Sequence, residues 1–327
     1  MAGERAAGVS VPSSTVANRS ATSTLGGMSG VWDDSERAAL VALLRVRPTD
    51  LTWPEITARV AQEGSARAVW AQLVPQDLFH EVEHSDDPLR VAARDVAAWT
   101  SAPFAFHTFM DDAYPAQLRD VHQMPPVLFT RGRLLAGDLG VCVVGSRSAS
   151  PRGRELAGEV ATALAGEGLS VVSGLAAGID RAAHEAALAA GGRTVAVIGT
   201  GITHAYPPAN AELQERIAGE GLVVSQFWPE AAPSKQSFPM RNAVMSGYGR
   251  ASVVIEAGET SGARIQARVA VEHGRPVILT KAVATGTSWG AAMTGRPGVW
   301  IAHTAAEVLA AVHEVLDVDR QAEELLA

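Results

Sequence analysis

The stretch Val141–Gly153, VCVVGSRSASPRG, decides the fold of this chain. Its four leading apolar residues do not alternate with polar ones, which predicts a strand buried on both faces, as in a parallel sheet. Ser150 is a suitable N-cap, and Pro151 suits the first helical position, where its missing N–H costs nothing. The stretch therefore predicts a strand, a tight turn and a helix N-terminus. Backbone N–H groups, small hydroxyls and Arg147 at such a turn favour an anion, and a phosphate above all.

The same strand-then-helix pattern repeats along the rest of the chain. A strand spacing of about 25 to 30 residues predicts βαβ units, and so an α/β fold with a doubly wound parallel sheet and right-handed crossovers. The predicted strands are Val141–Val144, Ser170–Val172, Thr194–Ile198, Leu222–Val224, Ser252–Ile255 and Pro276–Leu279, with Val299–Ile301 as a seventh. Helices are predicted over residues 152–166, 179–190, 209–219, 238–247, 261–273 and 304–316.

Composition changes divide the chain into five predicted segments. The first is rich in Gly, Ser, Ala and Thr without periodicity, which indicates a disordered leader. Four helices then follow, beginning near Ser35, Trp53, Ala66 and Asp87. A proline-containing stretch comes next and is expected to be extended. The segments are the leader (1–34), a helical N-terminal domain (35–100), an ordered connector with a short strand near 104–106 (101–137), the α/β core (138–316) and a fraying acidic tail (317–327).

Composition and charge limit the class of protein. The chain has 327 residues, a net charge of −8 and a single cysteine, Cys142. A lone cysteine cannot form an internal disulfide, which indicates a reducing compartment. There is no apolar run long enough to span a membrane and no secretory signal pattern, so we expect a cytoplasmic protein. The acidic balance argues against a surface coated in positive charge, although a local basic groove can still act in such a molecule.

Small polar residues follow each predicted strand. Because parallel strands deliver their carboxyl ends to one edge of a sheet, these residues are expected to converge. Glycine allows a close backbone approach and serine offers a donor to an oxygen, although tight βα turns use the same residue types. As a set they favour a site for a phosphate backbone or a nucleotide. The set is Gly145-Ser146-Arg147, Ser173-Gly174, Gly199-Thr200-Gly201, Ser225-Gln226, Glu256 and Thr280-Lys281.

Known cofactor and catalytic motifs are absent from the sequence. The stretch Gly199–His204, GTGITH, lacks the third glycine of a dinucleotide fingerprint, and no P-loop motif occurs. No His, Cys or Asp cluster has metal-ligand spacing. Gly145-Ser146-Arg147 does not match the Gly-x-Ser-x-Gly elbow of hydrolases. We therefore expect no cofactor, no metal and no catalytic residue.

The stretch Pro233–Asn242, PSKQSFPMRN, adds a second signal. Lys235 and Arg241 flank Phe238 at a predicted loop-to-helix junction. In single-stranded nucleic-acid binders, cations follow the phosphates while an aromatic ring stacks a base. Taken alone, the stretch favours Phe238 as a core anchor between solvated cations. With Arg147 at the same edge of the sheet, we favour single-stranded nucleic acid.

Several motifs together resemble one known family, DNA-processing protein A, also called Smf. The resemblance covers residues from about Tyr114 to Ala270. Its motifs, in chain order, are Tyr114-Pro115, Pro125–Phe129 with Arg131-Gly132, Val144–Arg147 with Ser150-Pro151 and Gly153, Ser173–Asp180 with Ala183-His184, Tyr206–Asn210, Phe238–Asn242 and Ser261-Gly262. The predicted helical segment also resembles the small SAM-like N-terminal domain common in that family.

The resemblance implies an extended Rossmann-like fold and a non-enzymatic role. Family members bind single-stranded DNA and pass it to RecA recombinase in natural transformation, usually as homodimers. The resemblance places Arg147 and Lys235 on phosphates and Phe238 on a base, while Asp180, as a helix cap, and His184 are structural. The DNA-binding residues it implies are Gly145, Ser146, Arg147, Ser173, Gly174, Lys235, Phe238, Arg241, Asn242, Ser261 and Gly262.

The chain also departs from the family pattern. Gln226 and Ala243 stand where the family commonly has Glu and Arg, and the segment after Pro276 is replaced. We also expect no winged-helix domain of the kind found at the C-terminus of many members. An alternative is therefore a nucleotide-binding sensor of a related Rossmann superfamily, in which a Gly/Thr-rich loop over 280–298 closes on the ligand. A phosphoribohydrolase ranks lower, because its Pro-Gly-Gly-x-Gly-Thr motif is absent.

Overall fold

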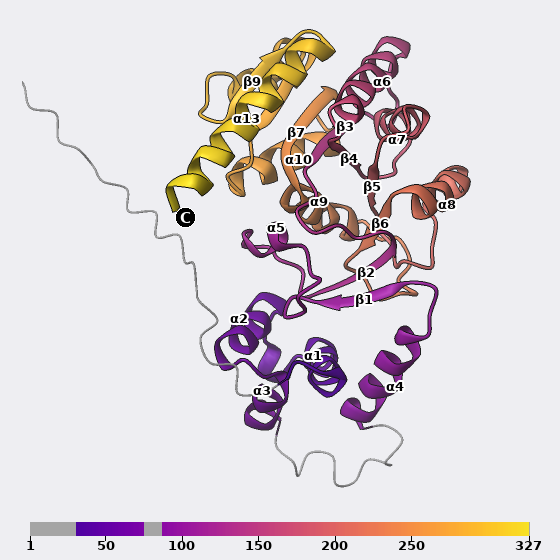
Figure 1. Ribbon diagram of the computed structural model, residues 1–327, viewed down its shortest axis with the longest axis vertical. Helices are drawn as coiled ribbons and strands as arrows, with labels where there is room; N and C mark the ends of the chain where they lie inside the picture. The colour runs from indigo at the N-terminus through magenta and orange to yellow at the C-terminus, as the bar shows by residue number, and fades with distance from the viewer. Residues whose placement is uncertain (1–30, 75–86, 327) are drawn as a thin grey trace, which may run out of the picture. The chain divides into compact units, whose positions relative to one another are not determined.

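A nine-stranded sheet forms the centre of the fold (Figure 1). The computed structural model of the chain describes residues 31–74 and 87–326. The strand order is β1-β2-β6-β5-β4-β3-β7-β8-β9, and β3 to β9 are mutually parallel. The predicted α/β class with a doubly wound parallel sheet is confirmed. The expected leader falls, up to residue 30, outside the described residues.

Most predicted elements lie close to their expected ranges, and β2, α5, α11 and α12 had no predicted counterpart. The strands are β1 Ala105–Thr108, β2 Val127–Gly132, β3 Gly140–Gly145, β4 Ser170–Ser173, β5 Thr194–Val197, β6 Leu222–Ser225, β7 Gly249–Glu256, β8 Val277–Thr280 and β9 Val299–Ala302. The helices are α1 Asp34–Val46, α2 Trp53–Glu63, α3 Ala66–Leu73, α4 Pro88–Thr100, α5 Ala116–Arg119, α6 Pro151–Gly166, α7 Ile179–Ala189, α8 Ala211–Glu220, α9 Ser237–Tyr248, α10 Gly262–Glu272, α11 Lys281–Gly286, α12 Ser288–Met293 and α13 Ala305–Leu326.

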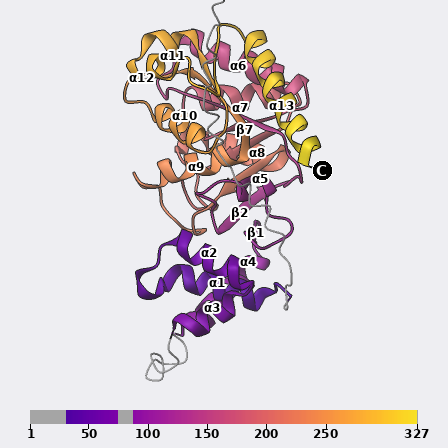
Figure 2. The ribbon, with the colours of Figure 1, turned by 90° about the vertical axis from the view of Figure 1, so that its left-hand side faces the viewer.

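Alternate residues of the central strand face two different helical layers. Val141 and Val143 of β3 belong to the core formed with α6, α7 and α13. Cys142 and Val144 belong to the core formed with α9 to α12. Figure 2 shows α9–α12 on one side of the sheet and α6 and α13 on the other. Because both faces are covered, the strand is apolar throughout, as its sequence predicts.

The predicted connector supplies strands β1 and β2, whose pairings are antiparallel. Strand β2 pairs with β6, with Phe129 opposite Ser225, and β1 pairs with β2. The short strand expected near residues 104–106 corresponds to β1. The pairing of β2 with β6 joins segments far apart in sequence, so local patterns do not reveal it. The sheet is therefore extended at this edge by chain that precedes the parallel core.

The prediction was wrong for the segment after β8. The expected Gly/Thr-rich loop consists of α11, α12 and their connections. Thr280 and Thr287 cap these helices by accepting from the N–H groups of Val283 and Gly290. Trp289 is buried, so the segment packs into the fold instead of forming an open flap. At the C-terminal end, α13 continues to Leu326 where a helix end at Leu316 and a fraying tail were expected.

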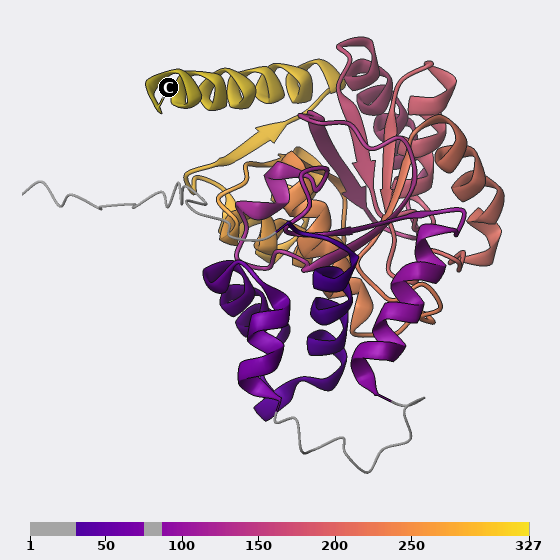
Figure 3. The same cartoon turned by 60° about the horizontal axis from the view of Figure 1, so that its bottom comes forward.

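Helices α1–α4 lie beside the β1–β2 edge and share a hydrophobic core with the sheet (Figure 3). Trp228, which follows β6, packs against Trp53 of α2 and Trp99 of α4, at centroid distances of 5.7 and 5.9 Å. The Cζ atom of Arg45 lies 4.9 Å from the Trp228 ring centroid. Aromatic and cation–π contacts of this kind join the helical region to the α/β part. Among the described residues, no helix has the length and apolar character needed to cross a membrane.

Candidate nucleic-acid interface

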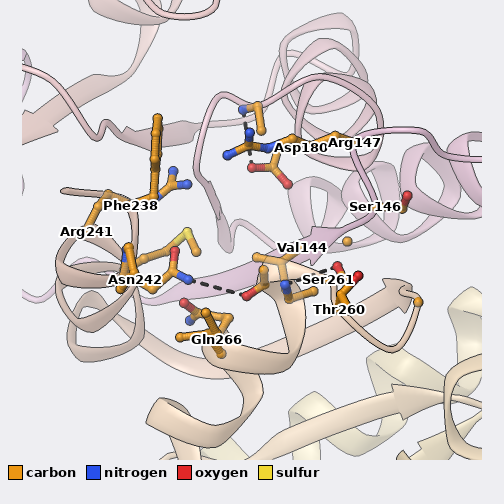
Figure 4. Close-up of a pocket in the computed structure, with 18 of the residues that line it drawn as sticks. Val144, Ser146, Arg147, Asp180, Phe238, Arg241, Asn242, Thr260, Ser261 and Gln266 are labelled. Atoms are coloured by element: carbon orange, nitrogen blue, oxygen red, sulfur yellow. Dashed lines mark hydrogen bonds between the residues drawn. The ribbon is translucent and has the colours of Figure 1, made fainter. Parts of the chain in front are cut away.

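A cavity of about 450 Å³ opens at the carboxyl edge of the sheet, where the turn after β3 meets the loop after β7. The start of α7, helix α9 and the first turns of α10 complete its wall (Figure 4). Strands β3 and β7 are neighbours, so the segments that follow them converge. Most of the predicted site residues line this cavity, namely Gly145, Ser146, Arg147, Phe238, Arg241, Asn242, Ser261 and Gly262.

Arg147 and Phe238 form a stacked pair at the cavity. The exposed Arg147 carries its Cζ atom 5.1 Å from the centroid of the half-buried Phe238 ring. Tyr206, which is 39% exposed, lies 5.7 Å from the same ring. Gly199 allows this placement, because a Cβ there would lie only 2.8 Å from the ring. The pair presents a positive charge and an aromatic face together, which suits a phosphate next to a base.

Lys235 lies on the loop between β6 and α9, outside the cavity wall. Its side chain is exposed and stands three residues before Phe238 in the chain. An exposed ammonium on a flexible stem can reach a phosphate without a preformed contact. The structure therefore leaves the Lys235 side chain exposed on the loop that leads into α9.

Arg241 is buried in the wall, where other protein groups engage its guanidinium. Its Nη1 donates to the Val197 carbonyl over 2.8 Å, and the side chain is only 5% exposed. Gly174 lies directly against the guanidinium, where a Cβ would collide with it. Burial lowers the pKa of Arg241, while the charge of Asp180 opposes that change. Arg241 thus brings positive charge to the wall but lacks a free, exposed guanidinium for a direct DNA contact.

Asp180 was expected to cap its helix, and that prediction was wrong. The N-cap of α7 is Gly178, in a left-handed conformation that suits glycine. The Oδ2 atom of Asp180 instead accepts from the N–H groups of Gly174 and Ala176, over 3.1 and 3.3 Å. Burial raises the pKa of this carboxyl, and Arg241 counteracts the rise. Asp180 therefore holds the turn after β4 against the back of the cavity.

Ser173 and Gly174 do not line the cavity, although both were predicted there. The Ser173 hydroxyl donates to the carbonyl of Val143 over 2.6 Å and is fully buried. Gly174 is occupied by its contact with Arg241. Both residues lie behind the cavity wall and support it, because β4 is on the opposite side of β3 from β7.

The N-terminus of α6 was expected to hold a phosphate, and a protein carboxylate is found there instead. Ser150 is the N-cap, as predicted, and accepts from the N–H of Gly153 over 3.0 Å. Glu256, at the end of β7, accepts from the Ser150 N–H over 2.9 Å and also from its hydroxyl. Glu256 thereby places a negative charge beside the first turn of α6, where negative charge is favoured. At this turn the protein's own carboxylate therefore lies where a phosphate was expected.

Asn242 and Ser261 shape the opposite wall. The Asn242 Nδ2 donates to the carbonyl of Gly262 over 3.5 Å, which links α9 to the start of α10. Ser261 is the N-cap of α10 and accepts from the N–H of Ala263. These contacts fix the two helices that face each other across the cavity.

Sequence reasoning missed several lining residues. Gln266 lines the cavity and donates to the Ser252 hydroxyl over 3.2 Å, and Thr260 lies beside Ser261. Helical spacing from Gly262 brings Ala263 and Gln266 to the same face as the N-terminus of α10, so periodicity alone could have found them. The remaining lining residues not predicted are Val144, Ser148, Ala176, Asp180, Pro239, Met245, Gly258 and Ile265.

Comparisons with known proteins agree with the sequence motifs. Residues 105–316 match the family model of DNA recombination-mediator protein A. DNA processing protein DprA of Streptococcus pneumoniae is 44% identical over 176 residues, which is 54% of this chain and 62% of that protein. Protein Smf of Synechocystis is 42% identical over 178 residues, which is 53% of this chain and 45% of that protein. The chain therefore matches about half to two thirds of the length of these relatives.

Solved structures share the fold. The crystal structure of DprA from Streptococcus pneumoniae superposes with a TM-score of 0.67 and 32% identity, over 85% of this chain and 97% of that one. DNA processing protein A from Helicobacter pylori gives a TM-score of 0.57, at 23% identity, over 64% of this chain and 96% of that one. From its motifs, its fold and the model match across most of the α/β region, the chain belongs to the DNA recombination-mediator protein A family, the family of the DprA and Smf proteins.

Proposed function

We propose that this protein binds single-stranded DNA at the cavity between β3 and β7 and loads RecA recombinase onto it. The observation that carries the proposal is the Arg147–Phe238 stack at the cavity, with exposed Lys235 on the preceding loop. In this arrangement Arg147 and Lys235 bind successive phosphates. Phe238 stacks a base. The base either shares the face of the ring with the Arg147 guanidinium or displaces it.

Family membership supports this proposal. The family is one of recombination mediators and not of enzymes. The Helicobacter pylori protein that shares this fold binds single-stranded DNA. RecA loading, homodimer formation and a role in natural transformation in the cytoplasm are proposed here from the resemblance to the family. They are the finer parts of the proposal, and each needs its own test.

The nucleotide-sensor alternative has lost the feature that favoured it. That interpretation required an open Gly/Thr-rich loop over residues 280–298 to close on a ligand. Helices α11 and α12 occupy this segment, with Trp289 and Met293 buried against the core. A packed helical pair does not serve as a flap, so we propose the DNA role alone.

Fluorescence anisotropy with labelled oligo-dT across a salt series tests the proposal, with a duplex of equal length as competitor. We expect binding that prefers the single strand and weakens with salt, with a log–log slope of about −0.7 for each phosphate contacted. Absence of binding at about 50 mM salt, or equal competition by duplex, would contradict the proposal. RecA filament formation on the oligonucleotide, with and without this protein, then tests the loading step.

A further inference from the structure

The contact between Glu259 and α12 joins the segment that departs from the family pattern to the wall of the cavity. Glu259 lies in the loop between β7 and α10. Its Oε1 accepts from the backbone N–H of Ser288 over 2.6 Å, and its Oε2 accepts from the Ser288 hydroxyl over 2.8 Å. Ser288 is the first residue of α12, so the two hydrogen bonds hold the carboxylate against this short helix.

The residues on either side of Glu259 show that its side chain is directed away from the cavity. Gly258 and Thr260, on either side of it, both line the cavity, whereas Glu259 does not. The indole N–H of buried Trp289 donates to the Gly258 carbonyl over 3.2 Å, which holds the same loop to α12 a second time. The side chain of Glu259 is thus directed to α12 from a backbone that faces the cavity.

We propose that Ser288 is a positioning residue that holds the Glu259 carboxylate away from the cavity, so that the cavity accepts phosphate. This inference rests on the proposed function. A carboxylate released from Ser288 would be within one residue of the cavity lining and would repel a phosphate bound there. The α11–α12 segment then contributes to the site, because Ser288 of α12 supplies both donors to the Glu259 carboxylate.

Ser288→Pro is the informative variant, because it removes both donors and suits the helix. Proline is favoured at the first helical position, where no intrahelical N–H bond is lost. The preceding Thr287 has φ −132° and ψ 146°, an extended conformation compatible with a following proline. Thr287 can still accept from the N–H of Gly290, so α12 keeps its cap. Thermal unfolding verifies that the variant is folded.

The test measures oligo-dT affinity by anisotropy for the wild type, Ser288→Pro, Glu259→Gln and the double variant. We expect Ser288→Pro to weaken binding by about threefold to tenfold at about 50 mM salt, and the loss to shrink as salt screens the charge. Glu259→Gln in the Ser288→Pro background should restore the affinity to within about twofold of wild type, because the repelling charge is gone. Glu55→Gln is the matched control. Glu55 makes the same kind of contact with Thr52 at the N-terminus of α2, and its loss should leave affinity unchanged.

Two results would overturn the proposal: a Ser288→Pro affinity equal to wild type, or a double variant as weak as Ser288→Pro. The second would mean that the contact acts through loop shape and not through charge. Failure of the wild type to bind oligo-dT would refute the proposed function, and the pKa of Glu259, measured by NMR titration, then decides the positioning role. The contacts with Ser288 lower this pKa, so it should rise in Ser288→Pro. An unchanged pKa would refute the positioning role independently of DNA.

Discussion

Phe238 and Arg241 lie three residues apart on α9 but have opposite environments. The Phe238 ring is half-buried at the cavity and has Arg147 on its face. The Arg241 guanidinium is enclosed and donates to the carbonyl of Val197. The Phe238 ring is therefore partly exposed at the cavity, whereas the Arg241 guanidinium is enclosed in the cavity wall. Substitutions at these residues therefore test different things.

Phe238→Ala should weaken oligo-dT binding by about 1–3 kcal/mol, because a base loses its stacking surface. Phe238→Trp should retain most of the affinity. Met240→Ala is a control on the same helix, since Met240 is 46% exposed and does not line the cavity. Anisotropy titration measures all three variants, and equal losses for Phe238→Ala and Met240→Ala would refute the stacking role.

Lys235→Ala should change the salt dependence of oligo-dT binding and leave the stability of the fold nearly unchanged. Loss of one phosphate contact reduces the steepness of the log–log salt plot by about 0.7 for a single strand. The free energy of unfolding should be nearly unchanged, because the side chain is exposed. An unaltered salt slope would show that Lys235 makes no phosphate contact.

His184 should make stability depend on pH. The Thr194 hydroxyl donates to the Val171 carbonyl, so it accepts from Nδ1 of His184, and the buried Nε2 has no partner. Burial, with a smaller contribution from the charge of Arg241, lowers the pKa of His184 to about 3. Below the ordinary value of about 6.5 the unfolded chain binds a proton that the folded chain does not, so stability falls as pH drops through this range.

The measurement is urea unfolding between pH 7 and pH 5. The His184 contribution to the loss of stability is at most about 1.4 kcal/mol per pH unit. His184→Asn, whose amide can still donate to Thr194, should give a shallower pH dependence. A variant that follows the wild-type curve would mean that His184 does not titrate in this way.

At the scale of elements, the N-terminus of α6 combines a cap with an internal anion. Ser150→Ala removes the acceptor for the Gly153 N–H and the hydroxyl donor to Glu256, and should cost about 1 kcal/mol of stability. Aspartate is ordinarily as good an N-cap as serine, but here its carboxylate would face that of Glu256. We therefore expect Ser150→Asp to be less stable than wild type as well. Its midpoint of urea unfolding should be lower. A Ser150→Asp variant as stable as wild type would contradict this account of the Glu256 contact.

At the scale of the whole molecule, Trp228 joins the helical region to the sheet. It packs against Trp53, Trp99 and Phe129, and Arg45 stacks on it. Trp228→Ala should lower the free energy of unfolding by about 3 kcal/mol, because the aromatic contacts and buried area are lost. The boundary predicted near residues 101–137 between a helical domain and the core stays a prediction.

Unfolding followed by far-UV circular dichroism and by tryptophan fluorescence tests this coupling. The two transitions should coincide in the wild type and separate in Trp228→Ala, as the helical region becomes independent of the sheet. Trp300→Ala is the control, since Trp300 is half-buried on β9 at the opposite edge of the sheet. Separate transitions in the wild type would refute the idea of a shared core.

The parallel strands, most of the helices and the residue motifs of the family can be recognised in the amino-acid sequence without a structure. Apolar runs such as Val141–Val144, and caps such as Ser150 and Pro151, act over a few residues, so they can be recognised without a structure. The convergence of Arg147, Phe238 and Ser261 could also be predicted from the strand pattern, because the carboxyl ends of parallel strands share one edge of the sheet.

Which of these groups are free to bind a ligand depends on contacts that are visible only in the folded protein. Glu256 occupies the helix N-terminus expected to bind phosphate, and Arg241 donates to the carbonyl of Val197. Strand β2 pairs with β6. The segment after β8 packs as two helices, which a local pattern of Gly and Thr residues does not reveal. In the first three cases the partner lies tens of residues away in sequence, so the outcome depends on long-range contacts and burial that a local pattern does not encode.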